Sequence, residues 1–480
     1  MQTQRRASVN SVSLNIPAGM PRTVGELRAA GHSYRTVKEE LRANLLTRMR
    51  SGEHRFPGIV GYDETVLPEL ERALLAGHDV VLLGERGQGK TRLIRSLWQL
   101  LDEWTPVIPG SELNEHPLHP ITPAARRQVE AGGDGMEISW LHRSYRFGEK
   151  LATPDTSVGD LIGDVDPIRV AQGRTLGDPE TIHFGLVPRT NRGIFAVNEL
   201  PDLAERIQVS LLNVLEERDI QVRGYQLRLP LDLLLVASAN PEDYTNRGRI
   251  ITPLKDRFGA EIRTHYPLDL ELEIALVRQE AGLVANVPDH VVEVLARFAR
   301  AVRESPAVDS RTGVSARFGI AAAETVAASA LRRAGLLGES EPVARIGDAV
   351  SVTSTLRGKV EFESGEEGRE IEVLSHLLRT ATAETFRTRL AGLDLSSFVN
   401  LVNDGNIIET GDLVPADEVL RQVGPVPGLA KVLDRLDLGD APNRGEAAAG
   451  VEFVLEGLHL TRRMSKALTA EGRTLYGSRE

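Results

Sequence analysis

The feature that most constrains this chain is a glycine-rich octapeptide set between a short apolar run and an amphipathic segment. Residues 79–83 (DVVLL) have the composition of a buried strand, and the octapeptide GERGQGKT follows at residues 84–91. Apolar residues then recur at helical spacing through residues 93–101. Strand, glycine-rich loop and helix in this order are typical of a phosphate-binding loop, in which backbone N–H groups surround phosphate oxygens. We therefore expect an α/β nucleotide-binding fold.

Each residue type in this loop has a physical role in binding phosphate or metal. Glycines allow the backbone to wrap around phosphates. Lys90 brings positive charge to the β- and γ-phosphates, and the Thr91 hydroxyl is suited to ligate Mg²⁺. The predicted cofactors are ATP and Mg²⁺, and the predicted contacts in the loop are Gly84, Gly87, Gln88, Gly89, Lys90 and Thr91.

Periodicity divides the 480 residues, which are too many for one hydrophobic core, into several parts. Residues 56–267 alternate short apolar runs with helical patterns, which is typical of βα units around a parallel sheet. Beyond residue 267, helical periodicity dominates. We expect an N-terminal helical arm over residues 1–55 with one amphipathic helix over 23–50, an α/β domain over 56–267, a helical lid over 268–360, and a helical C-terminal region over 361–480 that opens on the acidic stretch EFESGEEGRE.

Composition excludes several classes of function. No apolar run approaches the roughly 20 residues that span a bilayer, and no apolar stretch follows the basic pair near the start, so neither a membrane span nor a secretory signal is predicted. The chain has no cysteine, which excludes disulfides, thiolate catalysis and Cys-type zinc sites and fits a cytoplasmic location. The net charge of -11 disfavours nonspecific nucleic-acid binding, although a local basic groove would escape this argument.

A second motif, at residues 193–199, contains a candidate catalytic carboxylate. Residues 193–199 (GIFAVNE) are an apolar run that ends in a polar pair, where a P-loop ATPase places a magnesium-holding aspartate and a catalytic glutamate. Glu199 is suited to polarise the attacking water as a general base. Asn198 stands at the aspartate position beside the metal and brings no charge. A compatible alternative for Glu199 is an acidic residue favoured by the dipole of a helix over residues 201–217.

From residue 59 to about residue 317, the chain resembles the ATPase subunit of magnesium chelatase and the related MoxR ATPases of the AAA+ superfamily. Residues 156–168 (TSVGDLIGDVDPI), 184–187 (FGLV) and 191–194 (NRGI) are similar to the family's run through the helix-2 insert into the acidic motif. The resemblance implies an α/β P-loop AAA+ domain with a parallel sheet, followed by an α-helical lid and a helical C-terminal region. It also implies that Ile59 and Val60, in the IVGY box, line the adenine site.

The same resemblance extends to three polar residues. Residues 219–230 (DIQVRGYQLRLP) alternate as in a β-hairpin and resemble the pre-sensor-1 hairpin. The strand over residues 233–238 leads to Asn240, which resembles the sensor-1 residue that faces the γ-phosphate and the attacking water; a plain Asn-Pro turn is the alternative. Arg257, in LKDRF, resembles the arginine finger that acts on a neighbouring subunit, with a surface arginine as the alternative.

In the helical part, Arg317 resembles the sensor-2 arginine, which reaches the γ-phosphate from the lid. It stands near the start of a predicted helix that runs to about residue 334, with Ser315 as the expected N-cap. A cation is otherwise unfavourable near a helix start, which supports a functional interpretation over a surface one.

Departures from the family limit what is carried over. Asn198, an extra segment over residues 107–145 and the region beyond residue 370 are unlike the chelatase subunit, so porphyrin chemistry is not inferred. Three histidines in or near the extra segment are spaced too loosely for a convincing metal site, and a polar surface loop is the favoured interpretation. Three arginines beside the predicted hairpin face either a partner or pore, or solvent. These residues are His116, His119 and His142, and Arg218, Arg223 and Arg228.

The resemblance implies a homo-oligomeric ring, expected to be a hexamer, that hydrolyses ATP between neighbouring subunits. Its expected role is to remodel or assemble a partner, either a protein client or a protein with an integrin-type domain. Asn198 motivates one alternative, a nucleotide-binding scaffold with little turnover. A nucleic-acid or transcription remodeller is a further alternative, which the acidic charge and the missing GAFTGA-type loop oppose.

Overall fold

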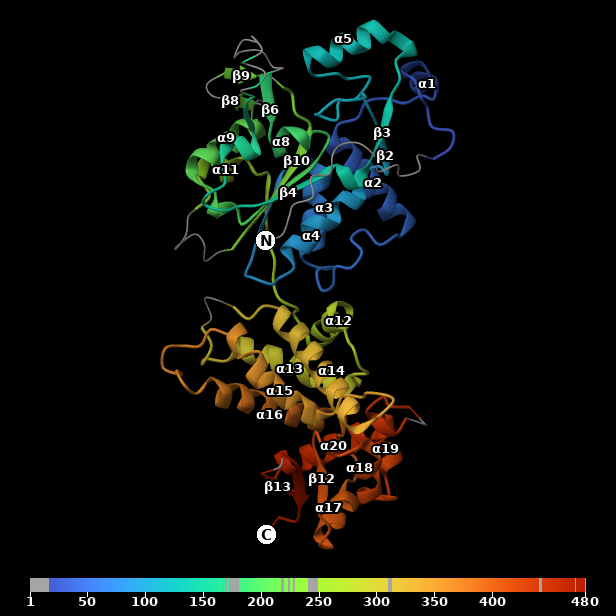
Figure 1. The fold of residues 1–480 in the computed structure, drawn as a ribbon, viewed down its shortest axis with the longest axis vertical. Helices are drawn as coiled ribbons and strands as arrows, with labels where there is room; N and C mark the ends of the chain where they lie inside the picture. Colours follow the sequence, from blue (N-terminus) through green and yellow to red (C-terminus); the bar gives the residue numbers. More distant parts are fainter. Residues whose placement is uncertain are drawn as a thin grey trace. The chain divides into compact units, whose positions relative to one another are not determined.

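The computed structural model describes residues 17–166, 168, 171, 181–216, 220–222, 225–227, 229–240, 249–309, 313–439, 443–470 and 472–479. These residues divide into two compact units (Figure 1). The α/β unit comprises the described residues up to Gly84 together with Gly89–Thr264, and the helical unit comprises Glu85–Gln88 together with the residues from His265 onward.

Among the described residues, five strands form one parallel sheet in the α/β unit. Every residue of its three central strands is buried, as expected for a parallel sheet covered on both faces. The α/β fold class inferred from the sequence is therefore confirmed. The strand order is β11 (Ala260–Arg263), β1 (Val80–Leu83), β10 (Leu233–Ala239), β7 (Gly193–Asn198) and β4 (Phe147–Leu151).

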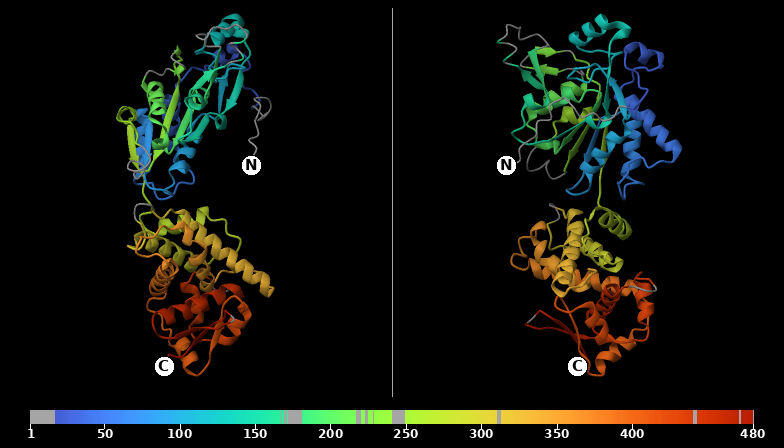
Figure 2. Two further views of the ribbon diagram at one scale, coloured as in Figure 1. Left: turned by 60° about the vertical axis from the view of Figure 1, so that its left-hand side comes forward. Right: turned by 45° about the vertical axis from the view of Figure 1, so that its right-hand side comes forward.

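Helices cover the two faces of this sheet (Figure 2). In β1, Val80 and Leu82 join one apolar cluster, whereas Val81 and Leu83 join the other, because successive side chains of a strand point to opposite faces. The first face packs against α2 (Val37–Ser51), α3 (Val66–Ala76) and α4 (Lys90–Ser96), and the second against α9 (Glu205–Glu216) and α11 (Thr252–Arg257).

The N-terminal segment contains two helices where the sequence predicted one. α1 (Val24–Ala29) and α2 are separated by a turn in which Gly31 takes a φ of 73°. α2 has its own start signal, because Thr36 and Glu39 form a reciprocal capping box. The prediction of a single helix over residues 23–50 was wrong because apolar spacing alone does not register a local cap.

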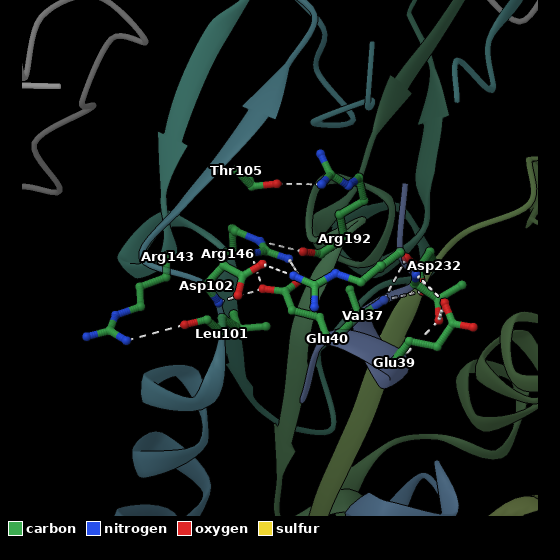
Figure 3. Close-up of polar contacts among 12 residues, drawn as sticks. Val37, Glu39, Glu40, Leu101, Asp102, Thr105, Arg143, Arg146, Arg192 and Asp232 are labelled. Carbon is green, nitrogen blue, oxygen red and sulfur yellow. Dashed lines mark hydrogen bonds and ion pairs between the residues drawn. The ribbon is translucent and has the colours of Figure 1, made fainter. Parts of the chain in front are cut away.

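A buried ion pair between Glu40 of α2 and Arg146, which directly precedes β4, links α2 to the sheet (Figure 3). Arg146 donates from its two terminal nitrogens to the two carboxylate oxygens of Glu40, at 2.7 Å each. The side chains are 0% and 5% exposed, respectively. The remaining donors and acceptors are also used, since Arg146 Nε donates to Arg192 O at 2.7 Å and Asp102 N donates to Glu40 Oε1 at 2.6 Å.

The extra segment over residues 107–145 packs into the α/β unit. β2 (Trp104–Val107) pairs antiparallel with β3 (Ser139–His142), and α5 (Pro123–Gly132) lies between them in sequence. His116 is 2% exposed and stacks on His32, with ring centroids 6.0 Å apart. The interpretation of a polar surface loop was therefore wrong for His116, because aromatic neighbours distant in sequence bury it.

The α/β unit also contains two antiparallel pairs of short strands. β5 (Gly163–Val165) pairs with β6 (Ile182–Phe184), and β8 (Ile220–Val222) pairs with β9 (Tyr225–Leu227). The second pairing confirms the hairpin predicted from alternation over residues 219–230. The three arginines predicted beside it, Arg218, Arg223 and Arg228, lie outside the described residues.

The helical unit is built around one large apolar cluster. Its C-terminal part also contains a small antiparallel sheet, in the order β12 (Ile408–Thr410), β14 (Thr474–Gly477) and β13 (Ser465–Leu468), which the sequence did not predict. No helix in the described parts of the chain is both long enough and apolar enough to cross a bilayer. The main helices are α12 (Leu270–Glu280), α13 (Asp289–Glu304), α14 (Arg317–Leu337), α15 (Val350–Thr355), α16 (Glu370–Arg389), α17 (Ser396–Asn403), α18 (Ala416–Val423), α19 (Leu429–Arg435) and α20 (Arg444–Leu460).

Candidate nucleotide-binding site

The glycine-rich loop follows the carboxyl end of β1, which lies between β11 and β10 in the sheet. Gly84 N donates to Ala239 O at 3.2 Å, which ties the loop start to the neighbouring strand β10. Gly87 and Gly89 have φ values of 76° and 78°, a left-handed conformation that glycine adopts without steric penalty. Gln88 is buried, and its Oε1 accepts a hydrogen bond from Glu85 N at 3.0 Å.

Lys90 opens α4 and is held by two oxygen acceptors. Its Nζ donates to Asn240 Oδ1 at 2.7 Å and to Gly84 O at 2.5 Å, and the side chain is buried. Asn240 Nδ2 in turn donates to Glu199 Oε2 at 2.7 Å. The structure thus joins three residues that the sequence placed in one site through a continuous chain of hydrogen bonds.

Glu199 sits directly after β7 in an uncommon backbone conformation. Its φ and ψ are 57° and 49°, the left-handed region, and its N–H donates to Ser238 Oγ at 3.3 Å. A non-glycine residue in this region is uncommon, and such residues cluster at functional sites. The helix predicted over residues 201–217 is divided into a short 3₁₀ helix over Leu200–Asp202, of which Glu199 is the N-cap, and α9 from Glu205. The alternative explanation for Glu199 therefore applies to one short turn and not to the dipole of a long helix.

Asn198, at the end of β7, lies beside Thr91. Its Oδ1 accepts from Ser238 Oγ at 3.3 Å and from Thr91 Oγ1 at 3.5 Å. Its Nδ2 donates to Glu149 Oε1 at 2.5 Å. The two predicted metal-site residues are therefore brought together, and a carboxylate that sequence reasoning missed joins them.

Glu149 lies on β4, 49 positions before Asn198 in the chain. It is also bound by Arg95 of α4, whose Nε and terminal nitrogen donate to its two oxygens at 2.8 and 3.0 Å. These hydrogen bonds and the adjacent charge raise the pKa of Arg95. The sequence signal for Glu149 was a single acidic residue inside a strand-like run, which is too common to single out.

Two predicted residues lie outside this cluster of contacts. Arg257, at the end of α11, is exposed and forms an ion pair with Glu216 of α9. Arg317 begins α14 in the helical unit and has an exposed side chain. Ser315 is not the N-cap as predicted, because Ala316 occupies that position and Ser315 Oγ instead accepts from Arg317 N at 3.1 Å.

Ile59 and Val60 precede α3. Ile59 is buried in the apolar cluster on the α4 side of the sheet, and Ile59 N donates to Phe56 O at 3.3 Å. Val60 is half-buried. The structure therefore places Ile59 against α3 and α4, which precede and follow the glycine-rich loop. The contact of Ile59 and Val60 with adenine stays a prediction.

Comparison with known proteins gives matches to a family model, to curated relatives and to solved structures. A family model described as the Sigma-54 interaction domain matches residues 175–257. The chain is 29% identical over 240 residues to magnesium-chelatase subunit ChlI-2, chloroplastic, of Arabidopsis thaliana, covering 48% of this chain and 53% of that protein. It is 28% identical over 240 residues to magnesium-chelatase subunit ChlI of Nostoc, covering 48% and 60%.

These matches span little more than half the length of the curated relatives. A crystal structure of a putative ATPase from Cytophaga hutchinsonii is 15% identical, covering 74% of this chain and 98% of that one, with a TM-score of 0.31. The match to the Sigma-54 interaction domain over residues 175–257 includes the acidic motif at residues 193–199.

Proposed function

We propose that the chain is an AAA+ ATPase of the magnesium-chelatase and MoxR-like kind, which its similarity to the ChlI subunits supports, and that it binds ATP with Mg²⁺ and hydrolyses ATP to remodel or assemble a partner protein. The observation that carries the proposal is the hydrogen-bonded chain of Lys90, Asn240 and Glu199 beside Thr91 and Asn198. Phosphate-binding charge, a carboxylate base and metal-binding oxygens converge there on the carboxyl ends of β1, β7 and β10.

The donor set fits Mg²⁺, which prefers oxygen ligands and keeps several of its waters. Thr91 Oγ1 and Asn198 Oδ1 are oxygens 3.5 Å apart. Thr91 would hold the ion directly, and Asn198 would accept a hydrogen bond from one of its waters. Bound Mg²⁺ neutralises charge between the β- and γ-phosphates.

The residues of this chain then have distinct tasks. Lys90 binds the β- and γ-phosphates, and Glu199 takes the proton of the attacking water while Asn240 fixes its carboxylate. Arg257 stabilises the transition state in a neighbouring subunit of a homo-oligomeric ring, which we expect to be a hexamer. Its ion pair with Glu216 is half-exposed and therefore weak enough to exchange for a phosphate. Arg317 contacts the γ-phosphate from the lid.

A nucleotide-binding scaffold with little turnover is the second candidate. It is favoured by Asn198, a neutral and buried residue at the aspartate position. In that case ATP would assemble the ring and a partner would recognise the assembled state. A third candidate, a remodeller of transcription complexes, is favoured by the match to the Sigma-54 interaction domain and opposed by the net charge of -11.

Calorimetry tests nucleotide binding directly. Lys90→Ala should abolish ATP binding, because the loop backbone alone does not replace the buried ammonium charge. Lys359→Ala, the same substitution at an exposed lysine of the helical unit, serves as the control and should bind like the wild type. Unchanged ATP affinity in Lys90→Ala would refute the nucleotide-site assignment.

Phosphate release separates the first two candidates. Glu199→Gln should bind ATP and lose turnover by roughly a hundredfold or more, since a general base contributes about that much. If the wild type turns over no faster than Glu199→Gln at any Mg²⁺ concentration, the scaffold replaces the motor. The same variant, which should hold ATP, is the bait of choice for recovering the protein client or an integrin-type partner.

A further inference from the structure

Glu149 determines how the amide of Asn198 is oriented. An ionised carboxylate only accepts hydrogen bonds, so the Asn198 atom facing Glu149 Oε1 at 2.5 Å is the Nδ2 donor. The amide oxygen must then face the other way, toward the hydroxyls of Thr91 and Ser238. Asn198 is thus held with its acceptor on the side where an aspartate oxygen would be needed.

Strand register explains why Glu149 can do this. Glu149 is paired with Ala196 in the parallel register of β4 and β7, so its side chain projects from the same face of the sheet as those of Ala196 and Asn198. α4 packs on that face, and it presents Thr91 and Arg95 one helical turn apart. The four side chains form a continuous row, Thr91 to Asn198 to Glu149 to Arg95.

We propose that Glu149 supplies the negative charge that Asn198 lacks, acting through the Asn198 amide as a positioning residue for Mg²⁺-ATP. This inference rests on the proposed nucleotide site. A hydrogen bond to an ionised acceptor is roughly twice as strong as a neutral one and polarises the donor amide. Asn198 Oδ1 therefore becomes a better acceptor for a metal-bound water than an isolated asparagine oxygen.

Arg95 anchors Glu149 without cancelling its effect. The Glu149 side chain is 21% exposed, whereas that of Arg95 is 61% exposed. Solvent screens the more exposed charge more strongly, so the carboxylate dominates on the buried side toward Asn198. The bidentate contact also restricts the carboxylate to the orientation that reaches Asn198 Nδ2.

The test measures affinity for a fluorescent non-hydrolysable ATP analogue across a Mg²⁺ titration and again in EDTA. Glu149→Gln keeps the size of the side chain and removes its charge. The Mg²⁺ concentration that gives half of the affinity gain should rise roughly tenfold, the lower end of the effect of losing an outer-shell partner. Affinity in EDTA should stay unchanged. Glu130→Gln, on an exposed face of α5, is the matched control and should behave as the wild type.

The second part of the test asks whether a second substitution restores the Mg²⁺ requirement of Glu149→Gln. Asn198→Asp added to Glu149→Gln moves the charge to the strand end and should restore the wild-type Mg²⁺ requirement. Asn198→Asp alone should help less, because it places two carboxylates within hydrogen-bond distance, where like charges oppose each other.

Three results overturn the inference: a Glu149→Gln protein with the wild-type Mg²⁺ requirement, an equal loss of affinity in EDTA, which indicates a merely structural role, or no rescue by Asn198→Asp. Failure of the proposed function itself looks different. In that case the wild type shows no nucleotide binding, or Lys90→Ala binds as well as the wild type.

Discussion

The ion pair between Glu40 and Arg146 should be the most sensitive point for the stability of the α/β unit. Both side chains are almost fully buried, and each makes hydrogen bonds beyond the pair, Glu40 with Asp102 N and Arg146 with Arg192 O. Removing one partner of a buried pair leaves an uncompensated charge and destabilises a protein by about 3–5 kcal/mol. We therefore expect that loss from Glu40→Gln and from Arg146→Met separately.

The double variant should lose much less than the sum of the two single variants. Neither charge remains buried, and the glutamine still offers an acceptor to Asp102 N. The main remaining defect is Arg192 O without its Arg146 donor, which is worth about 1–3 kcal/mol. Two single losses add to about 6–10 kcal/mol, so the coupling free energy should exceed about 3 kcal/mol.

Tryptophan fluorescence during guanidinium denaturation is the suitable assay. The three tryptophans of the chain, Trp98, Trp104 and Trp140, all lie in the α/β unit, so the signal follows that unit alone although the protein has two. Asp134→Asn, which breaks the exposed pair between Arg28 and Asp134, is the control and should change the free energy of unfolding by at most about 1 kcal/mol. Single variants no less stable than this control, or a coupling below about 1 kcal/mol, would refute the reasoning.

Two further predictions concern the neighbouring subunit and the helical unit. Arg257→Ala should bind ATP yet lose turnover roughly a thousandfold, and mixing it with Glu199→Gln subunits should restore activity where an intact Arg257 meets an intact Glu199; no recovery in verified mixed rings would argue against action in trans. Burial lowers the pKa of the His290 imidazole to about 3, and no described residue hydrogen-bonds its ring nitrogens. The folded unit therefore keeps the ring neutral while the unfolded chain takes up a proton below about pH 6.5, so stability should fall as the pH drops from about 6.5 towards 3, by about 1.4 kcal/mol per pH unit. His290→Leu should remove this part of the pH dependence, measured by hydrogen exchange of the α13 amides, and an unchanged slope would contradict it.

The sequence alone determined the elements whose signals are local. The strand, glycine-rich loop and helix around Lys90 are consecutive in the chain, and their order predicts a P-loop without tertiary information. The parallel sheet followed from buried apolar runs alternating with helical patterns, and the hairpin of β8 and β9 followed from alternation around a central Arg-Gly. These features depend on periods of 2 and 3.6 residues, which a single chain displays directly.

Tertiary structure decided everything that joins distant positions. Ile408 of β12 pairs with Tyr476 of β14, and Arg146 reaches Glu40 across 106 positions, so neither contact leaves a pattern within a sequence window. Glu149 became part of the candidate site only because β4 lies beside β7 in the sheet. The sequence shows directly that Asn198 lacks the charge of an aspartate. The carboxylate of Glu149, which lies within hydrogen-bond distance of Asn198, is found only in the folded chain. Strand register brings these two side chains together, and register leaves no periodic signal in the sequence.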